Sequence, residues 1–177
     1  MTEAYLNVLE LGYYEVTFAF EGLADENVWK RPAAGLLSVG ELAGHIAYWE
    51  ALTLAGEGGK LSGEGEEQSE TDLAKCRVSS PLIDRRFAYY PNTIATSPSA
   101  QPLAMTAGEV CRELLRVHEE AVAYFQTLNP DLESSAPGWP QNYTYDEFLK
   151  YAAFHVSYHT GQMFSARHLL GEETPDN

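Results

Sequence analysis

One stretch near the C-terminus decides how this chain folds: FHVSYHTGQMFSARHLL, residues 154–170. His155 and His159 stand four positions apart in it, among apolar residues at helical spacing. On a helix this spacing places both imidazoles on one face, one turn apart, and Gln162 falls on the same face. Two such nitrogens can bind one metal ion, as in helical zinc sites. A metal site would still need a third ligand from elsewhere in the chain.

Composition bounds the class of protein. The 177 residues are 45% hydrophobic and 21% charged, which predicts a single globular domain over residues 1–177. The net charge of −15 argues against a nucleic-acid partner and against binding to anionic membranes. A reduced, cytoplasmic protein is expected on three grounds. The two cysteines are far apart in the sequence, the N-terminus lacks a signal-peptide pattern, and no apolar run is long enough to span a membrane.

Apolar periodicity predicts four helices, over residues 2–23, 39–55, 107–128 and 145–170. Three of them begin at a capping box, in which a Ser or Thr is followed three residues later by Glu; these boxes start at Ser38, Thr106 and Thr144. Gly171 is the natural end of the last helix. Four helices without an alternating strand pattern predict an all-α four-helix bundle.

The connection between the second and third helices, residues 56–105, is much longer than such connections usually are. Its first part, residues 56–68, is rich in Gly and Glu and is expected to be solvated. The connection as a whole is expected to wrap the bundle, to cover a site or to meet a partner.

A separate signal lies in the second helix, where Gly44 costs about 1 kcal/mol of helix stability relative to Ala. We therefore expect another group to approach the backbone closely at Gly44.

His45 is the candidate third ligand, because it lies on the apolar face of the second helix, which a bundle packs near the last helix. Three imidazoles and an open position would form a catalytic-type zinc site, and nickel or iron would also suit them. His118 has charged neighbours and His168 points away from His159, so neither is expected in the site. The spacing alone is equally compatible with a hydrogen-bonded core pair of histidines and an isolated buried His45.

Two segments resemble the paired signatures of the DinB/YfiT-like superfamily. They are SVGELAGHIAYW (residues 38–49), with one His midway along the second helix, and FHVSYHTGQM (residues 154–163), with an H-x3-H-x-G-Q run. The approach to the second helix, ENVWKRPAAGLLSVGEL (residues 26–42), is also similar. The first and third helices resemble the family only in length and order, and the connection over residues 56–105 is not covered.

The resemblance implies a DinB-like four-helix bundle, often a homodimer, that binds a divalent metal through three histidines. Carried over to this chain, those histidines are His45, His155 and His159. Gln162 matches the glutamine of the family, for which support of a ligand or helix packing is the expected role. The long connection departs from the family pattern and is expected to change the mouth of the site.

Some members of this superfamily are thiol-dependent transferases or isomerases, in which zinc, nickel or a similar metal binds a low-molecular-weight thiol. In that case Trp49, Tyr48 and Tyr158 are candidates to line an apolar substrate pocket, with core packing as the alternative. A metal-dependent hydrolase needs a general base, and no carboxylate lies near the two paired histidines in sequence. A non-catalytic metal-binding or stress-related dimeric bundle is the third reading. No catalytic residue and no particular small-molecule substrate is indicated.

Overall fold

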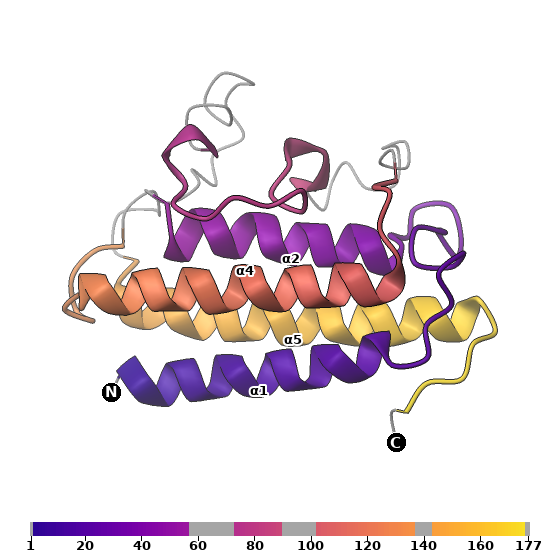
Figure 1. The fold of residues 1–177 in the computed structure, drawn as a ribbon. Coiled ribbons are helices and arrows are strands. Elements are labelled where there is room, and N and C mark those ends of the chain that lie inside the picture. The colour runs from indigo at the N-terminus through magenta and orange to yellow at the C-terminus, as the bar shows by residue number, and fades with distance from the viewer. Residues whose placement is uncertain (1, 57–72, 90–101, 137–142, 176–177) are drawn as a thin grey trace.

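The described part of the chain contains four long helices, and Figure 1 shows them side by side in one bundle. The computed structural model describes residues 2–56, 73–89, 102–136 and 143–175. Its elements are α1 (Thr2–Phe20), α2 (Val39–Leu54), the short 3-10 helix η1 (Arg85–Phe87), α4 (Ala107–Leu128) and α5 (Tyr145–Leu169). Within these ranges the only β-type pairing is an isolated bridge between Ser135 and Thr144. The predicted all-α four-helix bundle is confirmed.

Local signals fix the helix ends. All three capping boxes are formed. In each, the Ser or Thr side chain accepts a hydrogen bond from the backbone N–H of the Glu three residues later. Helix α1 ends at Phe20 rather than at the expected Leu23, because Gly22 takes a φ of 70° and turns the chain. Gly171 takes a φ of 79° just beyond α5, as expected for a helix end.

The helices do not alternate in direction. Helices α1 and α5 are parallel: Tyr5 hydrogen-bonds Asp146 near the start of both, and Arg167 donates to the Ala19 carbonyl near the end of both. Helices α2 and α4 run together in the opposite direction (Figure 1). The long connection is therefore a crossover: it returns the chain to the end of the bundle at which α2 began, and α4 begins there too. This order leaves α2 in contact with both α4 and α5.

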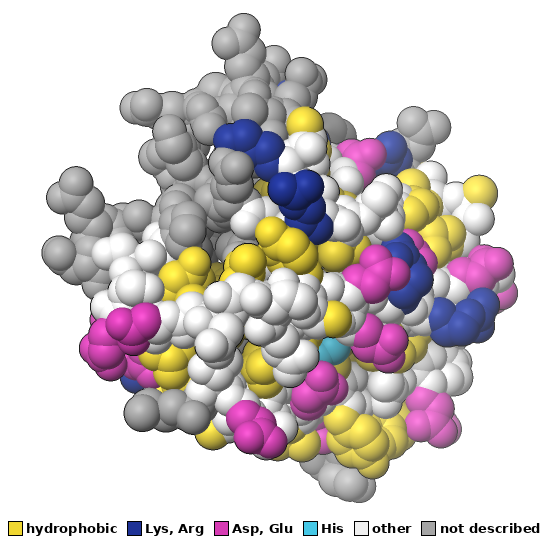
Figure 2. Space-filling view, turned by 60° about the vertical axis from the view of Figure 1, so that its left-hand side comes forward, with side chains coloured by type: hydrophobic (Ala, Val, Ile, Leu, Met, Phe, Trp, Pro, Cys, Tyr) yellow, Lys and Arg dark blue, Asp and Glu magenta, His cyan; other side chains and the backbone are white. Residues whose placement is uncertain are grey.

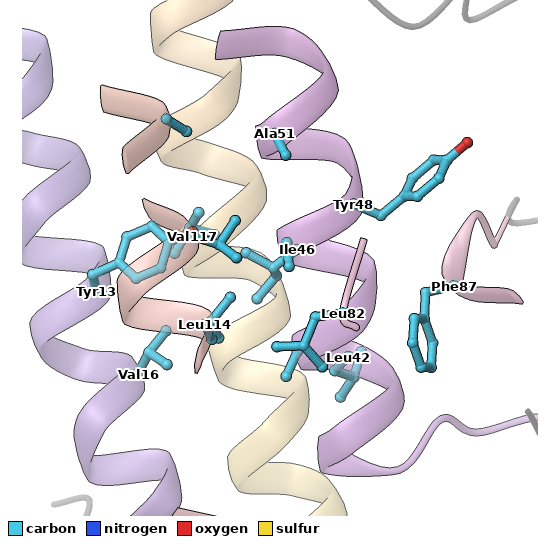
Figure 3. Close-up of a cluster of buried hydrophobic side chains, with 14 of the residues drawn as sticks. Tyr13, Val16, Leu42, Ile46, Tyr48, Ala51, Leu82, Phe87, Leu114 and Val117 are labelled. Carbon is cyan, nitrogen blue, oxygen red and sulfur yellow. The ribbon is translucent and has the colours of Figure 1, made fainter. Parts of the chain in front are cut away.

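Apolar side chains from all four helices fill the interior, and Figure 3 shows the part of this core between α1, α2 and α4. Tyr13 and Val16 meet Leu114 and Val117 there, beside Ile46 (Figure 3). Acidic side chains are scattered over the face in Figure 2 and form no single patch on it. In the described part of the chain, no helix is long and apolar enough to cross a membrane.

Part of the long connection packs along α2. The ring of Phe87, in η1, is fully buried against Gly44. A Cβ atom added to Gly44 would lie only 2.5 Å from this ring, so the expected close approach at Gly44 is confirmed. Apart from residue 56, the segment expected to be a solvated loop, residues 56–68, lies outside the described residues.

Candidate metal centre

Three histidines from two helices converge at the α2–α5 contact. His45 comes from α2, and His155 and His159 come from consecutive turns of α5. One nitrogen of each lies within 4.8 Å of the other two. The Nε2 atoms of His45 and His155 are 3.3 Å apart, which matches the edge of about 3.3 Å of a tetrahedron with metal–nitrogen bonds of 2.0–2.1 Å. The spacing of His155 and His159 predicts that these two rings lie together, and the packing of α2 on α5 brings His45 to them.

Hydrogen bonds to two of the rings determine which nitrogen is free. His45 Nδ1 lies 3.0 Å from the carbonyl oxygen of Phe87, which can only accept, so Nδ1 carries the proton and Nε2 the lone pair. His159 Nδ1 lies 2.7 Å from Oε1 of Gln162, whose amide group in turn donates to Oη of Tyr158 at 3.2 Å. His159 is therefore oriented in the same way. Such outer partners are typical of metal-binding histidines.

All three imidazoles are neutral at neutral pH. His45 and His159 are buried, and His155 is partly buried. Burial, together with the neighbouring imidazoles, lowers the pKa of His45 to about 3 and that of His155 to about 2. Burial also lowers the pKa of His159, and the hydrogen bond that His159 donates to Gln162 opposes this effect. Neutral rings are the form that binds metals, so protons compete weakly for these nitrogens.

The donor set fits a divalent transition metal. Among the described residues, the cluster contains only histidines and no carboxylate or cysteine. Three imidazoles suit zinc and nickel, and they leave a fourth position open. Because they carry no charge, a bound dication would keep its full +2 charge in a largely buried place, and an anion is the favoured fourth ligand.

The buried carboxylates of helix α2 are engaged elsewhere. Glu41 accepts hydrogen bonds from Arg31, from Ser38 of its capping box and from the hydroxyl of Tyr89. Glu50 pairs with His118, 2.7 Å away on α4. Neither one joins the histidine cluster, so the structure supplies no general base from α2.

Four aromatic rings surround the cluster. The Trp49 and Tyr89 rings lie 6.4 and 6.3 Å from the ring of His45, the Tyr151 ring stacks on His155 at 5.9 Å, and the Tyr158 ring meets His159 at 5.1 Å. Trp49 and Tyr158 therefore stand beside the histidines. Their contact with a substrate remains a prediction, as does the role of Gln162.

Among the described residues His118 lies outside the histidine cluster, as expected, but its surroundings differ from those that its sequence neighbours indicate. Its charged sequence neighbours suggested a solvent-facing position, but the side chain is buried, bonded to Glu50 and stacked on Tyr13 at 3.7 Å. Leu114 and Ala121, at helical spacing on either side, are fully buried and were the signal that could have shown this. His168 is exposed, as expected.

The family assignment agrees with the fold and the histidine geometry. The model of the DinB superfamily matches residues 9–163, and the chain belongs to this superfamily. The matched region contains His45, His155 and His159, together with Gln162. Searches among curated proteins and among solved structures give no match.

Proposed function

We propose that this protein binds one zinc or nickel ion through His45, His155 and His159 and catalyses a thiol-dependent transfer or isomerisation. The observation that carries the proposal is the donor set: three neutral, converging imidazoles with no carboxylate among them. A dication held only by neutral ligands favours an anion in its open position, and a thiolate is such an anion. Some members of the superfamily use a low-molecular-weight thiol in this way.

When bound, the metal supplies Lewis acidity that makes a thiol deprotonate near neutral pH. The thiol gives its proton to water, and its sulfur electron pair forms a carbon–sulfur bond with an electrophilic carbon. In a transfer, the leaving group departs with the electron pair of its own bond to that carbon. In an isomerisation, the carbon–sulfur bond breaks again and the thiol is regenerated. This scheme requires no base from the protein. It therefore agrees with the pairing of Glu41 with Arg31 and of Glu50 with His118, away from the histidine cluster.

The side chains around the histidines have separate tasks in this proposal. The Phe87 carbonyl and Gln162 hold the rings of His45 and His159 in orientation. The rings of Trp49 and Tyr158, which lie beside His45 and His159, contact an apolar electrophile. A small apolar electrophile is therefore the expected class of substrate.

The test is conjugation of monobromobimane by metal-loaded protein with cysteine, glutathione or 2-mercaptoethanol, each corrected for the rate without protein. We expect a rate that depends on the identity of the thiol and falls to background in His155→Ala, whereas His168→Ala, on the same helix, retains it. Turnover of an ester substrate without thiol would instead indicate a hydrolase. Retained metal without turnover of any electrophile would indicate a non-catalytic metal-binding bundle.

We also propose that the protein is a homodimer. Helix α1 exposes Val8, Leu11 and Tyr14 on one side, and α5 exposes Phe154, with 54–61% of each residue accessible. A second copy would cover these apolar side chains. Sedimentation equilibrium should then give twice the chain mass of 19.6 kDa, and Leu11→Lys should shift it toward 19.6 kDa. A wild-type mass of one chain would contradict the dimer.

A further inference from the structure

We infer that residues 84–89 of the long connection, here called the strap, are a positioning element of the metal centre that orients His45. This inference rests on the proposed metal site. The match to the family model, over residues 9–163, includes the strap, and the contacts that carry the inference are those of this chain's structure.

The strap supplies a hydrogen-bond acceptor to a ligand. The carbonyl oxygen of Phe87 accepts from His45 Nδ1 at 3.0 Å. This contact fixes both the rotation of the ring and the position of its proton, and it leaves Nε2 with its lone pair 3.3 Å from His155. If the carbonyl moved away, the ring could turn, and Nδ1 would compete with Nε2 as the unprotonated nitrogen.

One anchor of the strap is the side chain of Phe87. The ring is fully buried, stacks on Trp29 with centroids 6.1 Å apart and lies directly on Gly44, the residue before His45. Only a residue without a Cβ atom allows this contact, since an added Cβ would come within 2.5 Å of the ring. The glycine inside α2 therefore has a specific purpose, which is to let the strap reach His45.

The second anchor lies two residues further on. The hydroxyl of Tyr89 donates to Oε1 of Glu41 at 2.8 Å, and Glu41 is itself buried and paired with Arg31. At the other end, the side chain of Asp84 accepts from the backbone of Arg86 and caps η1. The ring of Phe87 and the hydroxyl of Tyr89 thus hold the carbonyl of Phe87 against the first half of α2, and Asp84 caps the turn that precedes it.

The main test introduces a methyl group between helix and strap. Gly44→Ala should displace Phe87 and weaken binding of Zn²⁺ by about 10- to 100-fold, the range found for outer partners of metal ligands. Gly161→Ala is the matched control, because Gly161 lies two residues after the ligand His159 on α5 and its added Cβ would meet nothing within 4 Å. Affinity is measured by competition with a chromogenic chelator, and Co²⁺ absorption spectra report whether the coordination changes.

Two further variants separate the strap from a general effect on the fold. Tyr89→Phe removes only the hydroxyl that reaches Glu41 and should weaken Zn²⁺ binding by a smaller factor, with an altered Co²⁺ spectrum. Phe87→Ala removes the ring that collides with a new methyl, so Gly44→Ala should cost less affinity in that background than in wild type. Circular dichroism and thermal midpoints of the metal-free proteins establish that each variant is folded.

The outcomes are distinguishable. If wild-type protein binds no metal, the proposed function fails. If wild type binds metal but folded Gly44→Ala and Tyr89→Phe bind Zn²⁺ as tightly, the role of the strap is wrong while the metal site stands. Should Gly44→Ala not fold, Tyr89→Phe alone decides: unchanged affinity and spectrum would overturn the inference.

Discussion

Helix α2 takes part in two buried histidine clusters of opposite character. On one face, His45 meets His155 and His159, with no carboxylate in the cluster. On another face, Glu50 pairs with His118 of α4, which also lies 3.2 Å from Glu10 of α1. Burial lowers the pKa of every ring in the first cluster, whereas the carboxylates outweigh burial and raise the pKa of His118. The first cluster suits a cation from solution, whereas the carboxylates of the second favour the protonated form of their own histidine.

The largest expected effect concerns the second cluster. His118→Leu leaves the buried carboxylate of Glu50 without its partner and should destabilise the fold by about 3–5 kcal/mol. Denaturant unfolding measures this loss. Adding Glu50→Met should recover much of it, because a buried pair replaced by apolar residues is often nearly neutral. If the double variant were as unstable as the single one, packing rather than charge would explain the loss.

Removing a ligand should affect the first cluster in a different way. His45→Ala or His155→Ala should weaken Zn²⁺ binding by at least about 100-fold, more than the loss of an outer partner. Neither change leaves a buried charge unpaired, so the metal-free protein should lose less stability than it does in His118→Leu. His118→Leu should bind Zn²⁺ as tightly as wild type. If His118→Leu does not fold, the double variant His118→Leu/Glu50→Met is measured in its place. Loss of affinity there would show that the two clusters are not independent.

A smaller effect is expected from the support of His159. Gln162→Leu removes the oxygen that accepts from His159 Nδ1 and should weaken Zn²⁺ binding about 10-fold. Gln162→Glu keeps an acceptor oxygen and should retain the affinity. Chelator competition measures both variants, and equal affinity in Gln162→Leu would assign this residue to helix packing.

The smallest effect is a pH dependence confined to the second cluster. Folded His118 binds a proton more tightly than unfolded histidine does, because its pKa is raised. Its contribution is therefore complete below the unfolded pKa and is lost as the pH rises through the folded pKa, with a slope of at most about 1.4 kcal/mol per pH unit. The variant His118→Leu/Glu50→Met should lack this slope. A wild-type stability that rose with pH in this window would contradict the pairing.

The two clusters also show what sequence can predict. The helix starts followed from capping boxes, which are local, and His155 with His159 followed from spacing within one helix. Gly44 indicated a close approach, but Phe87 lies 43 positions away and nothing in the sequence pairs the two. The charged residues beside His118 in the sequence conceal its buried position, which the apolar residues at helical spacing indicate, and its partner Glu50 is 68 positions distant. Both contacts join residues far apart in the chain. They depend on how the helices and the long connection are arranged, and the spacing of residues within one helix gives no information about that arrangement.

The most direct test of the metal centre is the metal content of untagged wild-type protein, measured by elemental analysis after purification without chelators. We predict one zinc or nickel ion per chain, reduced to a small fraction in His155→Ala and unchanged in His168→Ala. Wild-type protein without transition metal, which also fails to take up Zn²⁺ on dialysis, would contradict the account. The convergent histidines would then be a hydrogen-bonded core cluster.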